Sequence, residues 1–224
     1  MRKFLLTVFV CACSRRGYSQ TYAIESLEGS LDRVRLSHAL YSSRLAVSYQ
    51  GDTLYLGDYA GIVSVHVLGK NFLEVNYRSH GDSALETRNT AILTLSRHKI
   101  CASLVVNSYS ESKTSGERSL FKADFHLTQT KDRQYCLLAN VHDASNAGDT
   151  LIRLQFDVGE KIFYTERKRV EKSLKIFEPG EAERRMQTIH AILPLSMLSD
   201  NIYYFYQGNW YIEVMDDNWS KLTG

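Results

Sequence analysis

The residue types of a hydrolytic triad lie together in the segment 79–83. His80, Asp82 and Ser83 supply a base, an acid and a hydroxyl nucleophile within a few positions. Triad members are normally positioned by different structural elements, so this local clustering is typical of a polar turn. No serine of the sequence lies in a Gly-x-Ser-x-Gly elbow. We therefore expect a turn here and no catalytic serine.

A second polar cluster, at residues 142–149, contains oxygen atoms that could bind a cation. An EF-hand-like loop needs oxygen ligands at alternate positions. Those positions hold Asp143, Ser145 and Ala147, and the alanine supplies no side-chain ligand. Asp, Asn, Ser and Gly also favour ordinary turns for backbone reasons. We expect a loop at 142–149, with calcium binding as the alternative, and we predict no metal and no cofactor.

Acidic and histidine side chains are spread along the chain without a diagnostic motif. The sequence has 25 acidic residues, and sequence alone does not say which two of them could form a glycosidase pair. His66 and His126 fall on the polar faces of predicted strands, where solvated histidines are expected. The mixed-charge run Glu166–Lys172 is typical of a solvated turn, although contact with an acidic polymer is an alternative.

Aromatic side chains crowd one predicted C-terminal hairpin. Successive side chains of a strand point to opposite faces, so two sets are expected. The more apolar set should join the core: Phe205, Trp210, Ile212 and Val214. The other set should form an outer patch, our candidate binding site: Tyr204, Tyr206, Tyr211 and Glu213. Tyr and Trp are frequent at binding surfaces because they combine a large area with a polar tip. The alternative is that both faces are buried and the cluster is structural.

Alternation of apolar and polar residues predicts the elements that must position these side chains. It begins near Arg44 and recurs with turn residues between most segments, including Gly51-Asp52. Strands are expected at 45–49, 53–56, 63–67, 73–77, 91–95, 100–106, 121–127, 134–141, 150–158, 161–165, 173–177, 202–206 and 210–214. The fold class is therefore mostly β, an antiparallel meander forming a barrel or a two-sheet sandwich of about 9–11 strands drawn from these thirteen segments.

One or two short helices are expected beside the strands. Leu27, Leu31 and Val34 recur at helical spacing within 22–42, although this segment could also be an extended lead-in. A short helical turn or a solvated connection is expected at Glu181–His190. A loop rich in Ser, Glu, Lys and Gly is expected at 108–118.

The N-terminal segment is typical of a secretory signal. Residues 1–19 combine a basic start, a short apolar run and small residues before Gln20, so we expect cleavage after Ser19. The alternative is a lipobox that places a lipid on Cys13. The apolar run is too short to span a bilayer, and we expect no transmembrane span in the mature chain. Residues 20–224 should form a single β-rich domain in the periplasm or at the cell surface, lipid-anchored at the outer membrane if Cys13 is modified.

The net charge expected after removal of the signal excludes two classes of partner. Four of the 27 basic residues lie in the signal, so the mature chain should contain 23 basic and 25 acidic residues. This near neutrality argues against nucleic acid and anionic membranes as partners.

The two cysteines outside the signal segment are expected to lie too far apart for a disulfide. In a meander, Cys101 and Cys136 are separated by the 121–127 strand and lie about 10 Å apart. Disulfides need Cα atoms within about 7 Å, so we predict two free thiols.

The chain resembles uncharacterised exported β-rich proteins of Bacteroidetes-type bacteria. The resemblance lies in 17–20, Phe72–Tyr77, Glu160–Tyr164 and Gly208–Tyr211, and it implies location and fold but no activity. We expect a non-catalytic envelope module that binds an envelope protein, a glycan or a small amphipathic ligand. The runner-up is a hydrolase of extracellular polymers, which a tight cluster of Asp, Glu and His in one cleft would favour. The third interpretation is a structural component of an envelope assembly.

Overall fold

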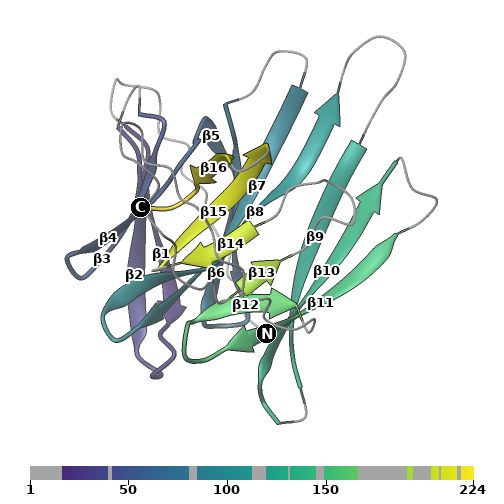
Figure 1. Ribbon diagram of the computed structural model, residues 1–224. Coiled ribbons are helices and arrows are strands. Elements are labelled where there is room, and N and C mark those ends of the chain that lie inside the picture. Colours follow the sequence, from purple (N-terminus) through teal and green to yellow (C-terminus); the bar gives the residue numbers. More distant parts are fainter. Residues whose placement is uncertain are drawn as a thin grey trace, which may run out of the picture.

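The computed structural model describes residues 17–39, 42–80, 85–112, 120–130, 132–144, 149–165, 191–193, 203–206, 208–215 and 218–224. These residues form sixteen strands in three antiparallel sheets, and they include no helix (Figure 1). The prediction of a mostly β, antiparallel fold is confirmed. The expected count of strands was too low, because strands at both ends of the chain lack a clear alternation signal.

The first sheet contains β1 (Ser19–Glu25), β2 (Leu31–Ser37), β3 (Leu45–Tyr49) and β4 (Asp52–Leu56) in that order. The helix expected at 22–42 is wrong, because β1 and β2 form a hairpin that pairs Ser19 with Ser37 and Glu25 with Leu31. Val34 and Leu36 are buried at alternate positions, whereas Leu31 is 76% exposed. The helical spacing of the leucines therefore did not mark a buried helical face.

The β3–β4 turn lies one residue before its predicted position. Tyr49 pairs with Asp52, which leaves Gln50 and Gly51 as the two turn residues. Both have positive φ, 46° and 87°. Two positive φ values are the geometry of the tight hairpin turns that match the twist of paired strands.

The second sheet is an eight-stranded meander in which every strand pairs with its neighbours in sequence. Its strands are β5 (Gly61–Leu68), β6 (Phe72–Arg78), β7 (Leu85–Ser96), β8 (Lys99–Ser112), β9 (Leu120–Gln129), β10 (Tyr135–Asp143), β11 (Thr150–Asp157) and β12 (Ile162–Thr165). The meander order was predicted correctly. The loop expected at 108–118 is wrong for its first residues, because β8 extends to Ser112, where Leu85 and Ser112 still pair across β7 and β8. Residues 113–118 lie outside the described residues.

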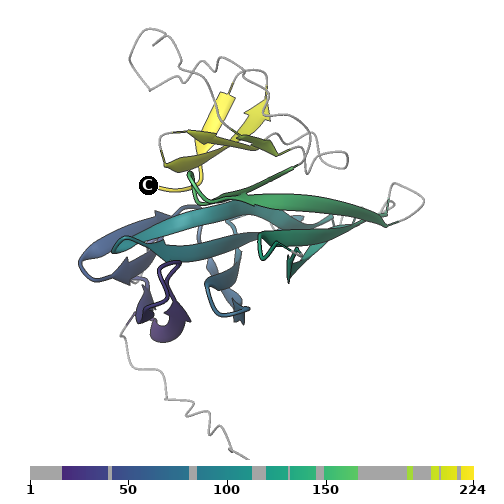
Figure 2. The ribbon, with the colours of Figure 1, turned by 90° about the horizontal axis from the view of Figure 1, so that it is seen from below.

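The third sheet contains β13 (Ala191–Leu193), β14 (Tyr203–Tyr206), β15 (Asn209–Met215) and β16 (Asn218–Lys221). It lies over one side of the eight-stranded sheet (Figure 2). Past β16, the amide of Gly224 donates to the Tyr55 carbonyl and the amide of Tyr55 donates to the Gly224 carbonyl, both at 3.1 Å. These bonds join the third sheet to the first. The strand expected at 173–177 and the helical turn expected at 181–190 lie outside the described residues.

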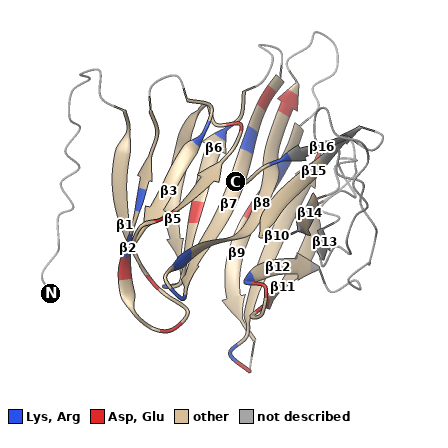
Figure 3. Cartoon of the chain, turned by 60° about the vertical axis from the view of Figure 1, so that its left-hand side comes forward, with Lys and Arg blue, Asp and Glu red and all other residues tan. Residues whose placement is uncertain are grey.

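All three sheets contribute to one hydrophobic core. Val47 of β3, Val75 of β6 and Trp210 of β15 are fully buried members of the same cluster. The eight-stranded sheet stays open, since β5 and β12 do not pair, and the closed-barrel alternative is therefore wrong for the described strands. Acidic and basic residues are interspersed along the strands (Figure 3). In the described part of the chain, no helix has the length and apolar character needed to cross a membrane.

Candidate functional site

The candidate site arises where two strands of the large sheet separate. β8 and β9 pair only near one end, through Tyr109 with Lys122 and the next two residue pairs. β8 nevertheless continues to pair with β7 as far as Lys99. Beyond Tyr109 the two strands therefore diverge. This divergence lets the sheet curl instead of remaining flat.

Contacts at the Phe72 end of β6, the end away from the β8–β9 pairing, complete this curl. The ring of Phe72 lies 5.0 Å from the ring of Tyr135 on β10 and 5.3 Å from that of Phe156 on β11, measured between centroids. The Tyr135 hydroxyl donates to Asn71 Oδ1 at 2.5 Å. β6 is separated from β10 and β11 by three or more strands in the sheet order. Their contact therefore means that the sheet curls back on itself.

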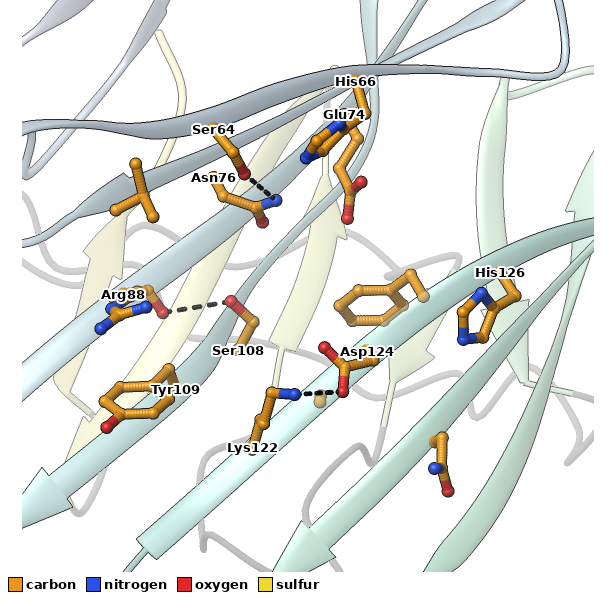
Figure 4. A pocket seen from close by; sticks show the side chains of 14 residues that line it. Ser64, His66, Glu74, Asn76, Arg88, Ser108, Tyr109, Lys122, Asp124 and His126 are labelled. Atoms are coloured by element: carbon orange, nitrogen blue, oxygen red, sulfur yellow. Dashed lines mark hydrogen bonds and ion pairs between the residues drawn. The ribbon is translucent and has the colours of Figure 1, made fainter.

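A pocket of about 420 Å³ lies inside the curl, within the size range of small-ligand sites. Figure 4 shows its side chains converging from strands on both sides of the divergence. Most of the lining is polar: Ser64, His66, Glu74, Asn76, Arg88, Ser108, Tyr109, Lys122, Asp124, His126 and Asn140, with Val63, Ala123 and Phe125 as the apolar members.

A hydrogen-bond network fixes the polar floor of the pocket. Asn76 Nδ2 donates to Ser64 Oγ at 3.1 Å. Thr90 Oγ1 lies 2.5 Å from Asn76 Oδ1 and 2.7 Å from Ser108 Oγ. The backbone explains the arrangement, because Asn76 pairs directly with Ser64 on β5 and with Thr90 on β7, so these side chains share one face.

Glu74 is the most deeply buried ionisable group of the lining, with an exposed fraction of 9%. It pairs with His66 across β5 and β6, and its carboxyl group points into the pocket (Figure 4). Burial raises the pKa of this carboxyl group, and a hydrogen bond with Asn76 and the nearby His66 oppose only part of that rise. Asp124 adds to the rise. Glu74 therefore holds a proton more tightly than an ordinary surface glutamate.

The facing wall is the β9 strand, whose exposed residues alternate along the pocket. Lys122 Nζ lies 2.6 Å from Asp124 Oδ2, and both side chains are about half exposed. His126 follows on the same face. On the other side, the Arg88 guanidinium lies 4.3 Å from the centre of the Tyr109 ring and 2.7 Å from Glu86 Oε1. The wall thus presents both signs of charge.

Of the residues of this site, only the two histidines are candidates that the sequence pattern predicts. His66 and His126 lie on exposed strand faces as expected, but the curl brings both to one pocket. Glu74 and Asp124 were missed among the 25 acidic residues. One signal was present, since Glu74 lies between the apolar residues of a strand that proves to be almost wholly buried. Among the described residues, no three His, Cys, Asp or Glu side chains are placed to hold a metal ion.

The inner face of the predicted aromatic hairpin is structural. Phe205 and Trp210 are buried and Ile212 packs against the core, as predicted for these three residues. Trp210 Nε1 donates to the Ala102 carbonyl at 2.7 Å. The Asn107 amide donates to the Tyr203 hydroxyl at 2.9 Å. Both backbone groups belong to the part of β8 that does not pair with β9. Side chains of the third sheet therefore supply hydrogen-bond partners where β9 does not.

The outer set of the hairpin stays a prediction. Tyr204 and Tyr211 pair across β14 and β15, and Tyr211 is partly buried. The side chains of Tyr204, Tyr206, Glu213 and the inner residue Val214 lie outside the described residues.

The remaining sequence candidates that fall on described residues do not line this pocket. His80 Nδ1 lies 3.5 Å from Asp58 Oδ1, and both side chains are about half exposed. At the ends of the loop expected at 142–149, His142 Nδ1 lies 2.8 Å from Asp149 Oδ1. Residues 81–84, 145–148, the charge run 166–172 and Cys13 lie outside the described residues. Cys101 and Cys136 are both free thiols, as the meander predicted.

Comparison of the chain with protein-family models, with curated proteins and with solved structures finds no match. The pocket itself is therefore the feature that bears on function.

Proposed function

We propose that this chain is an exported binding module of the bacterial envelope that takes up a small, neutral glycan fragment beside Glu74. The observation that carries the proposal is the composition of the 420 Å³ pocket. Each sugar hydroxyl both donates and accepts hydrogen bonds, so a sugar site needs both kinds of group. Asp124 supplies acceptors, Lys122 and Arg88 supply donors, and Asn76 and Asn140 supply both.

The balance of charge in the pocket favours a neutral ligand. Arg88 and Lys122 each have an acidic partner, Glu86 and Asp124, within an ion-pair distance. A strongly charged ligand would be better served by a lining of one sign. The nearly neutral net charge expected for the mature chain points the same way.

Export is part of the proposal and rests on the signal-like residues 1–19. The strand β1 begins at Ser19, the last residue of that segment, and the Tyr18 ring lies 6.1 Å from the His38 ring. Cleavage after Ser19 would remove this tyrosine, whereas processing at Cys13 would retain it. The intact mass of the exported protein distinguishes a chain that starts at Gln20 from a lipidated chain that starts at Cys13.

Binding of sugars to matched histidine variants tests the proposed site. Saturation-transfer NMR with a panel of mono- and disaccharides should identify a ligand, and calorimetry should give its affinity. His126→Leu removes a polar group from the exposed wall of the pocket. It should weaken binding about tenfold, equivalent to about 1.4 kcal/mol. His142→Leu is the control, because His142 is also exposed on a strand but does not line the pocket.

The outcomes separate the candidate roles. Equal affinity in both variants, or no binding of any sugar, would overturn the proposed site. A constitutive oligomer without ligand binding would favour the structural role in an envelope assembly instead.

A further inference from the structure

Two carboxyl groups line the pocket in very different surroundings. Glu74 lies on the floor, nine-tenths buried, between the apolar residues Leu73 and Val75 of β6. Asp124 lies on the β9 wall, half exposed, in an ion pair with Lys122. Figure 4 shows the two groups directed into the same pocket from different strands. In acid–base sites, two carboxyl groups whose surroundings favour different protonation states take different roles.

We propose that the pocket hydrolyses the glycosidic bond of its ligand, with Glu74 as the proton donor and Asp124 as the base that activates water. This inference rests on the proposed function, because it requires a glycan in the pocket. It replaces the expected non-catalytic role with the hydrolase that a cluster of Asp, Glu and His in one cleft would favour.

The reaction balances with water as the only co-reactant. The bond between the anomeric carbon and the leaving oxygen breaks while the Glu74 carboxyl group transfers its proton to that oxygen. A water oxygen forms a new bond to the anomeric carbon, and Asp124 accepts the proton that this water loses. Transfer of one proton from Asp124 to Glu74 through solvent restores both groups. Direct attack by water inverts the configuration at the anomeric carbon.

The burial of Glu74 fits the donor role. A general acid must hold its proton near the working pH, and burial raises the pKa of Glu74 towards that range. The charged or titratable groups that face it are His66 from β5, Arg88 from β7, Tyr109 from β8, and Lys122, Asp124 and His126 from β9. Because the histidines could also donate a proton, the test must assign the donor by a property of Glu74 alone.

Dependence on the leaving group makes this assignment. The full mature chain is incubated with 2,4-dinitrophenyl and methyl glycosides of the sugar that it binds. Glu74→Gln should lower turnover of the methyl glycoside about 10²–10⁴-fold, the usual contribution of a general acid. The dinitrophenyl glycoside should lose much less, because its leaving group departs without a proton. Asp124→Asn should slow both substrates, since both need the activated water.

The control is Glu160→Gln, the same substitution at an exposed glutamate in the β11–β12 turn, which should leave turnover unchanged. Sugar binding without hydrolysis of any glycoside would overturn the catalytic inference and leave the proposed binding function intact. Absence of binding would overturn both. Equal loss for the two leaving groups in Glu74→Gln would exclude it as the acid. A product of retained configuration, observed by NMR, would exclude water activation by Asp124.

Discussion

Tyr203 offers the sharpest test of how the third sheet supports the large one. Its side chain is 1% exposed, and its hydroxyl accepts the Asn107 amide of β8 at 2.9 Å. Tyr203→Phe keeps the ring but removes this acceptor where β9 has diverged. A buried donor left without a partner costs about 1–3 kcal/mol. For a chain of this size, each kcal/mol lowers the melting temperature by about 2–4 °C, so a fall of about 2–12 °C is expected.

Two measurements separate the lost hydrogen bond from a general effect of the substitution. Urea unfolding gives the change in stability, with Tyr55→Phe as control because the Tyr55 side chain is 42% exposed. That control should change the free energy of unfolding by less than about 0.5 kcal/mol. Hydrogen exchange of the Asn107 amide should accelerate in Tyr203→Phe under native conditions.

Trp210→Phe extends the test to the second of these bonds. It removes the indole N–H that the Ala102 carbonyl accepts at 2.7 Å and also reduces the buried volume. It should therefore destabilise the chain at least as much as Tyr203→Phe. Unfolding curves of Tyr203→Phe and Trp210→Phe that match the wild type would refute the role of these side chains as substitutes for a strand.

Two further predictions concern the thiols and Glu74. Alkylation without reductant should label the partly exposed Cys101 in the native chain, but slowly, because burial raises the pKa of its thiol. The buried Cys136 should be labelled only after unfolding. Protection of both thiols until reduction would contradict the strand order. The raised pKa of Glu74 means that the folded chain binds this proton more tightly than the unfolded chain. Its contribution to the free energy of unfolding is therefore fully present below the ordinary pKa of 4.5 and is lost as the pH rises through the folded pKa. The free energy of unfolding, measured across this pH range, should depend less on pH in Glu74→Gln than in the wild type. An unchanged pH dependence would contradict the raised pKa of Glu74.

The sequence by itself determined the strands with clear alternation and their order. Val63, Val65 and Val67 mark β5, and the corresponding patterns mark most of the strands from β6 to β11. This works because the pleat sends successive side chains to opposite faces, a local property of the chain. Short turns between successive strands then favour pairing of sequence neighbours, from which the free state of Cys101 and Cys136 followed.

Only the tertiary structure decided the conformation of Ser19–Ser37, where a helical spacing of apolar residues is overridden by strand pairing. Leu27, Leu31 and Val34 match a helical period, yet pairing of β1 with β2 and burial of Val34 and Leu36 against the core favour a hairpin. The spacing of Leu27, Leu31 and Val34 carries no information about the packing against the core that favours the hairpin.

The candidate site was likewise decided by tertiary structure. Glu74 and Asp124 line one pocket because β8 and β9 separate beyond Tyr109 and the sheet curls until Phe72 contacts Tyr135. Local alternation assigns each carboxylate to a polar strand face but contains no information about how a sheet coils. That coiling depends on side chains from distant strands packing together, so a residue that alternation assigns to a wet face becomes the buried floor of a pocket.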